Sequence, residues 1–298
     1  MVEVAERWTL GFVGEVMLPP VKSEKEARAI VSAGLGRAEL ELATSFTAPL
    51  YWIIREADGK YRARNGSAFF LDAGEGPFGV TANHVIDEWR QDRAHGNVVP
   101  LQLGLDLQLD LEGEHAIIAA HRELDVATFR ITGNEIKRIG KQILTGYQKS
   151  WPPGPPKQDR GVYYSGFPAT ETLWLSPRAI SFGAAPGGGV ASSVSETDIS
   201  IHIERQYLIA VMDGGSPPEN YDFGGISGGP VLTVVETNTI RSWALAGVIY
   251  EGPNPSPDEA KAIAGLEIIR ARRAHFILPD GQLDIHRWVI AANRLQQR

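Results

Sequence analysis

The sequence predicts an antiparallel all-β protein, and two observations point to it. From Leu50 onward, short runs rich in Val, Ile, Tyr, Phe and Trp alternate with glycine and proline. The 298 residues are 43% apolar and 22% charged, which is enough to bury a core in one large domain or two small ones. The runs most typical of strands are residues 50–57, 66–73, 98–111, 115–121, 125–131, 161–167 and 207–212.

Helices are expected only at the two ends of the chain. Ser23 and Glu26 have the spacing of a capping box and Gly34 is a stop signal, so one short helix is predicted within an N-terminal extension of residues 1–44. A second helix is predicted over residues 283–298, where Asp284 can cap the first turn. Its buried face is expected to follow the i, i+3, i+4, i+7 spacing of Ile285, Trp288, Val289 and Ala292.

Two proline- and glycine-rich stretches are expected to lie outside regular structure. Residues 149–160, "KSWPPGPPKQDR", form the richest proline cluster and predict a linker between two halves of the chain. Residues 185–198, "APGGGVASSVSETD", predict a long polar loop. No Gly-Lys-Ser/Thr follows their three glycines, so a phosphate-binding loop is not expected.

Composition and charge narrow the possible functions. A net charge of −7 argues against nucleic acid as a partner, and no uninterrupted run of 18 apolar residues predicts a membrane span. Cysteine is absent, which excludes disulfides, thiolate zinc sites and a cysteine nucleophile. The first residues have no basic cluster ahead of an apolar run, so a secretory signal is not predicted and a cytoplasmic location is expected.

The stretch "DFGGISGGP", residues 222–230, places Ser227 among four glycines. A serine hydroxyl becomes a good nucleophile when a neutral histidine accepts its proton and a carboxylate orients that histidine. The carbonyl oxygen under attack becomes negative and needs hydrogen-bond donors. The main-chain N–H groups of Gly225 and Ser227 can supply them if the local backbone is free to bend.

Two other stretches offer the base and the carboxylate. His84 follows a predicted strand, at the start of what we expect to be a short helical turn, and Asp125 begins another predicted strand. Asp87, three residues after His84, is a rival carboxylate that we expect to cap or end the helical turn. The other histidines lack the His-x-x-x-His spacing of a zinc site, so no metal is expected and they are interpreted as surface or packing residues; they are His95, His115, His121, His202, His275 and His286.

Three segments of the chain resemble the signature segments of trypsin-like serine proteases of the bacterial or housekeeping type. They are Thr81–Val85, Glu123–Ala127 and Gly225–Pro230, in the family's order of histidine, aspartate and serine. The resemblance covers about residues 45–298. It implies two six-stranded antiparallel β-barrels, about residues 45–148 and 161–282, followed by the C-terminal helix.

The resemblance also implies the roles of these residues. His84 would be the general base and then the general acid, Asp125 would orient it, Ser227 would attack, and the N–H groups of Gly225 and Ser227 would form the oxyanion hole. The implied activity is that of a serine endopeptidase acting on a protein or peptide through an acyl-enzyme, without a cofactor. Ile226 stands where activated digestive proteases carry an aspartate, so activation by N-terminal cleavage is not expected.

Substrate specificity is less clear from the sequence. By the same resemblance, Tyr221 and Asp222 align with the floor of the pocket for the residue before the scissile bond, and Tyr250, Glu251 and Gly252 align with its wall and entrance. Asp222 or Glu251 would favour basic substrate residues, whereas Tyr221 would make the pocket shallow.

Two alternatives to the endopeptidase remain open at this stage. One is a protease-fold binding or regulatory protein without turnover, in which loops or residues 1–44 block the cleft. The other is an esterase that uses the same three residues, although α/β-hydrolases place the nucleophile first in the chain. A regulatory partner protein would be compatible with each of them.

Overall fold

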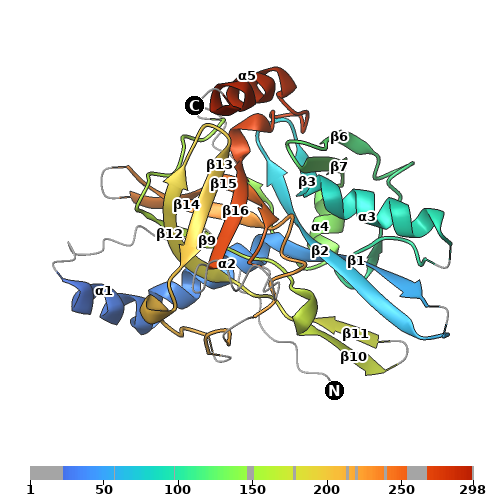
Figure 1. Ribbon diagram of the computed structural model, residues 1–298, viewed down its shortest axis with the longest axis horizontal. Helices are drawn as coiled ribbons and strands as arrows, with labels where there is room; N and C mark the ends of the chain where they lie inside the picture. The colour runs from blue at the N-terminus through green and yellow to red at the C-terminus, as the bar shows by residue number, and fades with distance from the viewer. Residues whose placement is uncertain are drawn as a thin grey trace.

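The computed structural model describes residues 23–56, 58–96, 98–145, 151–176, 179–212, 215–218, 221–237, 240–253 and 267–296. The expected extension before residue 23 and residues 149–150 of the expected linker lie outside this part. The prediction of an all-β protein is confirmed, because two β-sheet units account for most of the regular structure (Figure 1).

The first unit is an eight-stranded sheet with the order β5-β4-β1-β2-β3-β7-β6, and β8 pairs with β2. It differs in detail from the expected six-stranded barrel, because β4, β5 and β8 are additional pairings of only two residues each and the order is open within the described residues. The strands are β1 (Thr47–Arg55), β2 (Tyr61–Asp72), β3 (Pro77–Thr81), β4 (Gln102–Leu103), β5 (Leu107–Gln108), β6 (Ile117–His121), β7 (Val126–Arg130) and β8 (Leu144–Thr145).

The second unit is a closed six-stranded antiparallel barrel with the order β12-β13-β16-β15-β14-β9, as expected. A two-stranded hairpin, β10–β11, lies between β9 and β12 along the chain. With the first sheet and the C-terminal helix, this barrel is consistent with an all-β chymotrypsin-like fold. The strands are β9 (Gly161–Tyr164), β10 (Thr172–Ser176), β11 (Ala179–Phe182), β12 (Gly187–Val194), β13 (Asp198–Ile203), β14 (Pro230–Thr237), β15 (Ile240–Glu251) and β16 (Glu267–Arg273).

Two of the sequence predictions in this unit are wrong. Residues 185–198 are not a loop, because Gly187–Val194 form β12, which closes the barrel between β9 and β13. A Cβ on Gly187 would lie 2.3 Å from the Tyr164 ring, so the missing side chain lets that ring pack over the strand. Residues 208–212 form no strand, although their composition is apolar.

The N-terminal helix is longer than predicted. Helix α1 (Glu24–Ile30) begins at Ser23, whose side chain accepts the Glu26 N–H. Gly34, with a φ of 123°, bends the chain instead of ending the helix, and α2 (Gly36–Phe46) follows. Helix α2 spans the boundary predicted after residue 44 and packs on the barrel through Leu40, Ala43 and Phe46, which are buried.

Three apolar clusters hold the structure together. In β2, Phe69 and Leu71 face a cluster shared with β14, β15 and the C-terminal helix, whereas Phe70, on the opposite face, belongs to a cluster inside the first unit. A third cluster, including Ile201 and Val231, fills the barrel. The shared cluster joins the two units and therefore sets their relative position.

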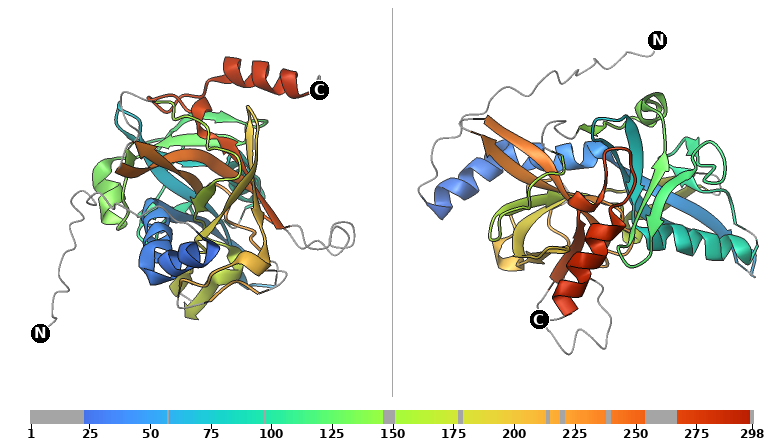
Figure 2. Two further views of the ribbon diagram at one scale, coloured as in Figure 1. Left: turned by 90° about the vertical axis from the view of Figure 1, so that its left-hand side faces the viewer. Right: turned by 90° about the horizontal axis from the view of Figure 1, so that it is seen from above.

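The C-terminal helix α5 (Ile285–Gln296) lies at the top of the molecule in Figure 1 and in the left view of Figure 2. Asp284 caps it, because its carboxylate accepts the Arg287 N–H at 3.0 Å. Trp288 is buried as predicted, but Val289 is 45% exposed and Ala291 completes the buried face instead. The exposed position of Val289 corrects the predicted stripe.

The remaining helices are α3 (Asn83–Ala94) and α4 (Gly133–Arg138), both in the first unit. A full capping box starts α4, because the Thr132 and Glu135 side chains each accept the other residue's N–H. Within the described residues, none of the helices has the length and apolar character needed to span a membrane.

Candidate active site

His84 lies in the first turn of α3, immediately after β3 ends at Thr81. Its ring Nδ1 is 2.7 Å from Asp125 Oδ2, and its main-chain N–H donates to Asp125 Oδ1 at 2.8 Å. The carboxylate therefore holds both the backbone and the ring of the same histidine. Such an arrangement places the proton of a neutral imidazole on Nδ1 and leaves Nε2 free to accept one.

Asp87 is not a partner of His84. Its Oδ2 accepts a hydrogen bond from Asn83 Nδ2 at 3.0 Å and contacts the Arg122 guanidinium at 3.3 Å. The expected short turn is in fact the twelve-residue helix α3, and Asp87 lies inside it, so this residue neither caps nor ends the helix.

Asp125 sits in a tight turn with a φ of 54°, a conformation that is uncommon outside glycine. The turn is held from within, because the Asp125 N–H donates to His121 O at 2.8 Å and the Leu124 N–H donates to His121 Nδ1 at 3.1 Å. It is also held from the other unit. Arg272 Nε donates to Leu124 O and Arg272 Nη2 to Glu123 O, both at 3.1 Å.

Arg272 was not identified from the sequence. Its guanidinium forms an ion pair with Asp198 and lies 4.2 Å from the centroid of the Tyr250 ring and 4.9 Å from that of Trp288. The side chain is 17% exposed, so these contacts are largely shielded from water. One arginine of β16 thus connects the Asp125 turn to β13, β15 and α5, and no local sequence pattern marks it for this role.

The surroundings of His84 change its pKa in opposing directions. Burial lowers the pKa, but the hydrogen bond and the charge of Asp125, with smaller contributions from Glu88 and Asp87, outweigh burial and raise it above the ordinary value. The imidazolium form is therefore stabilised, which suits a group that must take up a proton.

The Ser227 segment packs against the segment that carries His84. The Ser67 N–H donates to Ser227 O at 2.8 Å. A Cβ on Gly228, whose φ is +89°, would lie 2.0 Å from Ser67 O and 3.0 Å from Ala82 N. Only glycine fits here, because both the backbone conformation and the space exclude a side chain. The fold therefore brings Ser227 next to the start of α3, two residues before His84.

Two successive turns orient the amides on either side of Ser227. The Ile226 N–H donates to Phe223 O and the Gly229 N–H to Ile226 O, with positive φ at Gly225 and Gly228, as type II turns require. The Ala169 N–H donates to Gly224 O at 2.7 Å. Because the peptide between Gly224 and Gly225 is trans, the Gly225 N–H points in the direction opposite to that carbonyl.

The same reasoning gives the direction of the Ser227 N–H. Ile226 O accepts the Gly229 N–H, and the peptide between Ile226 and Ser227 is trans, so the Ser227 N–H points away from Gly229. Ser67 Oγ also donates to Gly225 O at 2.9 Å and accepts the Phe167 N–H at 2.9 Å, which fixes the loop to β2. Neither the Gly225 N–H nor the Ser227 N–H has an acceptor among the described residues. Sequence reasoning missed Ser67.

The Ser227 hydroxyl itself donates to Tyr250 O at 3.3 Å. Within the described part of the chain it forms no hydrogen bond with His84. The Ser227 hydroxyl is thus bound to the main chain of β15.

Two of the residues predicted for the specificity pocket, Tyr221 and Gly252, both lie against Phe223. A Cβ on Gly252 would be 3.0 Å from both Phe223 and Ile226, so the end of β15 packs on the Ser227 loop. Tyr221 donates its hydroxyl proton to Glu171 Oε1 at 2.7 Å, and burial, followed by the effect of Glu171, raises its pKa to about 12.

The two acidic residues expected to favour basic substrates differ in their availability. Glu251 forms an ion pair with Arg270 at 3.2 Å, and both side chains are exposed. The Asp222 carboxylate accepts the Gly224 N–H at 2.7 Å and is also exposed. Asp222 therefore has no cationic partner among the described residues, whereas Glu251 already has one. The described residues contain no group of three or more His, Asp and Glu side chains suited to holding a metal ion.

Comparison with known proteins adds little to this picture. No protein-family model matches the chain, and no curated protein matches it. Similar solved structures include one described as "Aromatic interactions drive the coupled folding and binding of the intrinsically disordered Sesbania mosaic virus VPg protein", with 11% identity, a TM-score of 0.37, and coverage of 78% of this chain and 94% of that chain. Another is described as "Crystal structure of Deg5", with 15% identity, a TM-score of 0.38, and coverage of 77% and 87%. At these scores the likenesses carry no argument, and the fold rests on the strand pairings described above.

Proposed function

We propose that this protein is a serine endopeptidase that cleaves peptide bonds through an acyl-enzyme on Ser227. The observation that carries the proposal is the pair of hydrogen bonds that the Asp125 carboxylate accepts from His84, formed where the Ser227 loop packs against the start of α3. A carboxylate that fixes an imidazole beside a serine among glycines is the arrangement that nucleophilic acyl transfer needs.

The proposed reaction uses these residues in a definite order. His84 Nε2 accepts the hydroxyl proton as Ser227 Oγ forms a bond to the scissile carbonyl carbon, and Asp125 stabilises the resulting imidazolium. The N–H groups of Gly225 and Ser227, which have no acceptor among the described residues, bind the oxyanion. His84 then gives its proton to the leaving amine as the C–N bond breaks. A water molecule, deprotonated by His84, hydrolyses the ester and restores Ser227.

One observation favours a second candidate, a protease-fold protein without turnover. Ser227 Oγ donates to Tyr250 O and not to His84. Hydrogen bonds between catalytic groups are often long or absent before substrate binds, and a serine side chain rotates readily, so this geometry is compatible with the peptidase. It nevertheless makes the reactivity of Ser227 the decisive measurement.

A fluorophosphonate probe tests both candidates, because it phosphonylates a serine only when a base and an oxyanion hole activate it. The peptidase proposal expects one adduct on Ser227, no adduct in Ser227→Ala, and much slower labelling in His84→Gln. Ser192→Ala is a matched control, since Ser192 lies in β12 of the same barrel and donates to Ser200 O. Folded protein that forms no adduct on Ser227 would contradict the peptidase and favour the silent protein.

Activity should follow the same pattern. Cleavage of a fluorogenic peptide library by the wild type is expected to fall by ~10⁴-fold in Ser227→Ala, the order found when one member of such a triad is removed. Cleavage of small esters without any peptide cleavage would instead favour an esterase. Because Asp222 lacks a cationic partner, we expect a preference for basic residues before the scissile bond, reduced in Asp222→Asn.

A further inference from the structure

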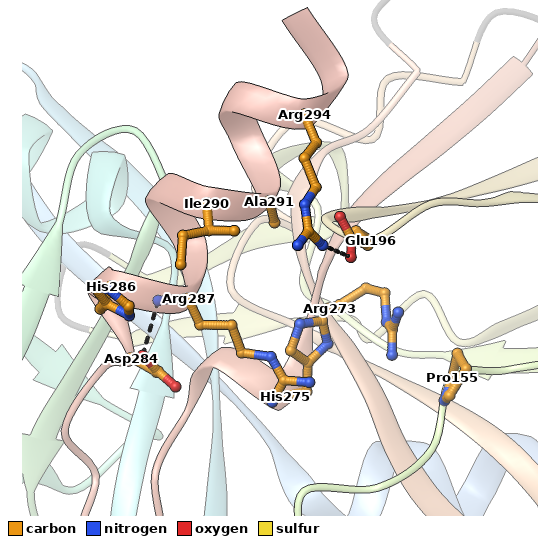
Figure 3. Close-up of a pocket in the computed structure, with 10 residues that line it drawn as sticks. All are labelled: Pro155, Glu196, Arg273, His275, Asp284, His286, Arg287, Ile290, Ala291 and Arg294. Carbon is orange, nitrogen blue, oxygen red and sulfur yellow. Dashed lines mark hydrogen bonds and ion pairs between the residues drawn. The ribbon is translucent and has the colours of Figure 1, made fainter. Parts of the chain in front are cut away.

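A second candidate site lies on the barrel under α5 and was not expected from the sequence. A cavity of about 570 Å³ opens between α5, the end of β16 and the turn that precedes β13 (Figure 3). Its polar lining includes Arg273 and His275 from the β16 side and Arg287 from α5. Cavities of this size hold small organic ligands and are larger than one inorganic phosphate ion.

The charges in this cavity are only partly compensated. Arg294 Nη1 forms an ion pair with Glu196 Oε1 at 2.9 Å, and the Asp284 carboxylate is used to cap α5. Arg273 donates to Ser195 O at 3.2 Å but has no carboxylate partner among the described residues. The Arg287 guanidinium has no hydrogen bond or ion pair with any described residue. Two guanidinium groups therefore face the cavity without an ion-pair partner among the described residues, although Glu196 acts on Arg273 at longer range.

The unpartnered nitrogen of His275 is a second observation that points to a ligand in this cavity. The residue is only 6% exposed, and its Nδ1 is buried without a hydrogen-bond partner among the described residues. Burial, followed by the charges of Arg273 and Arg287, lowers its pKa to about 3. The ring is therefore neutral at physiological pH and can donate one N–H from Nδ1. A buried donor without an acceptor is costly, and a ligand in the cavity would supply the acceptor.

The cluster of Arg273 and Arg287 is not a consequence of a basic composition, because the net charge of the chain is −7. Burial, followed by the charge of Arg287, lowers the pKa of Arg273, and Glu196 opposes this only in part. An anion bound between the half-buried Arg273 and the exposed Arg287 would relieve the repulsion between these like charges. Guanidinium groups match the oxygens of phosphate with two parallel N–H bonds, and Figure 3 shows Arg287 extending from α5 toward His275.

Part of the cavity lining is apolar. Ile290 and Ala291 lie on α5 beside Arg287, Pro155 lies on a separate segment (Figure 3), and Ile290 is 40% exposed, so it can contact a ligand. A carboxylate carries one negative charge, whereas a phosphate monoester carries close to two and has three acceptor oxygens. The guanidinium groups of Arg273 and Arg287 and the neutral N–H donor of His275 therefore fit a phosphate monoester better than a carboxylate.

We propose that this cavity binds a phosphate monoester, with its phosphate on Arg273, Arg287 and His275 and its organic group against Ile290. The site is distinct from the His84–Ser227 site and does not depend on the endopeptidase proposal. Ser227→Ala is therefore expected to bind the same ligands as the wild type, so a failure of either proposal can be recognised separately.

Calorimetric titration of the full chain with phenyl phosphate tests the proposal, at constant ionic strength so that salt screening does not vary. Inorganic phosphate and benzoate are the companion probes. Inorganic phosphate lacks the apolar ring, and benzoate keeps the ring but replaces the phosphate by a carboxylate. We expect saturable binding of phenyl phosphate, weaker binding of inorganic phosphate and the weakest binding of benzoate. Benzoate binding as tightly as phenyl phosphate would overturn the choice of phosphate.

Variants locate the binding. Arg287→Gln is expected to weaken phenyl phosphate binding by about tenfold or more, the usual effect of removing one charge-assisted contact. Arg62→Gln is the matched control and should change nothing, since Arg62 is an exposed arginine of β2 paired with Glu56. Ile290→Ser should weaken phenyl phosphate but not inorganic phosphate. No saturable binding, or unchanged binding in Arg287→Gln, would overturn the proposal; both variants alter exposed positions of α5, and circular dichroism checks that they fold.

Discussion

Arg272→Met offers a sharp test of how the candidate active site is held together. The substitution keeps an unbranched side chain of similar length but removes every donor and the charge. It thus deletes the hydrogen bonds to Leu124 O and Glu123 O, both 3.1 Å long, and the ion pair with Asp198. Asp125 follows directly after these two carbonyl groups, so its turn loses its connection to β16.

The expected magnitude can be worked from these contacts. Hydrogen bonds from a charged donor contribute about 1.5 kcal/mol or more each, so losing two of them should lower the free energy of unfolding by about 3 kcal/mol. A displacement of the turn by ~1 Å moves the carboxylate that orients His84, and misplacements of that size cost on the order of 10²-fold in kcat. KM should change little, because Arg272 lies behind Asp125 and is not among the residues expected to contact substrate.

The pH dependence separates a positioning role from simple packing. Asp125 raises the pKa of His84, so a carboxylate held less closely should let burial lower that pKa. The acidic limb of the kcat/KM profile is therefore expected to move to lower pH in Arg272→Met. Arg272→Lys should restore the charge but only part of the activity, because an ammonium group cannot reproduce the fork that binds both carbonyls.

Urea unfolding and steady-state kinetics with a fluorogenic peptide provide the measurements. Arg130→Met is the control, since Arg130 is an exposed arginine at the other end of β7, the strand that follows Asp125. If Arg272→Met lost the expected stability but kept kcat within about twofold and the wild-type pH profile, Arg272 would be a packing residue only and the reasoning would be refuted.

Three further predictions follow from the same contacts. Gly228→Ala should lower the free energy of unfolding, measured by urea titration, by more than about 3 kcal/mol, because its Cβ would lie 2.0 Å from Ser67 O. Gly59→Ala is the control. Gly59 has a φ of +83° and no atom within 4 Å, so this change should cost only about 1 kcal/mol of backbone strain. His84 has a raised pKa in the folded state, so the stability difference between wild type and His84→Gln should be largest below its unfolded pKa and disappear as pH rises through the folded value; an equal difference at about pH 5.5 and about pH 9 would contradict this. Ser67→Ala removes the hydrogen bond to Gly225 O and should lower kcat by about tenfold with little change in KM, while Ser242→Ala, whose hydroxyl donates only to Val235 O, should match the wild type in the same assay.

Several features could be predicted from the sequence because their signals are local. Alternation of apolar residues with glycine and proline indicated the β class, and the positions of Asp284 and Trp288 predicted the C-terminal helix. The residue types around His84, Asp125 and Ser227 also identified the candidate site. The errors arose where a local signal was ambiguous. Gly187–Val194 resembles a loop in composition, but it forms a strand because it pairs with β9 and β13 and the Tyr164 ring fills the space left by Gly187.

The order of the amino acids alone therefore determined the fold class and the presence of a helix near each end, and it selected His84, Asp125 and Ser227 as candidates. Only the tertiary structure shows that His84 pairs with Asp125, 41 residues away, and not with Asp87, which is much nearer in the sequence. It also decided that Ser67 and Arg272 support the two halves of the site across 158 and 148 residues of sequence, and that Arg287 meets His275 under α5. The physical reason is that a periodic pattern reports only which face of a strand or helix is buried. Which distant groups share a hydrogen bond or a charge depends on how the two units pack on their common apolar cluster.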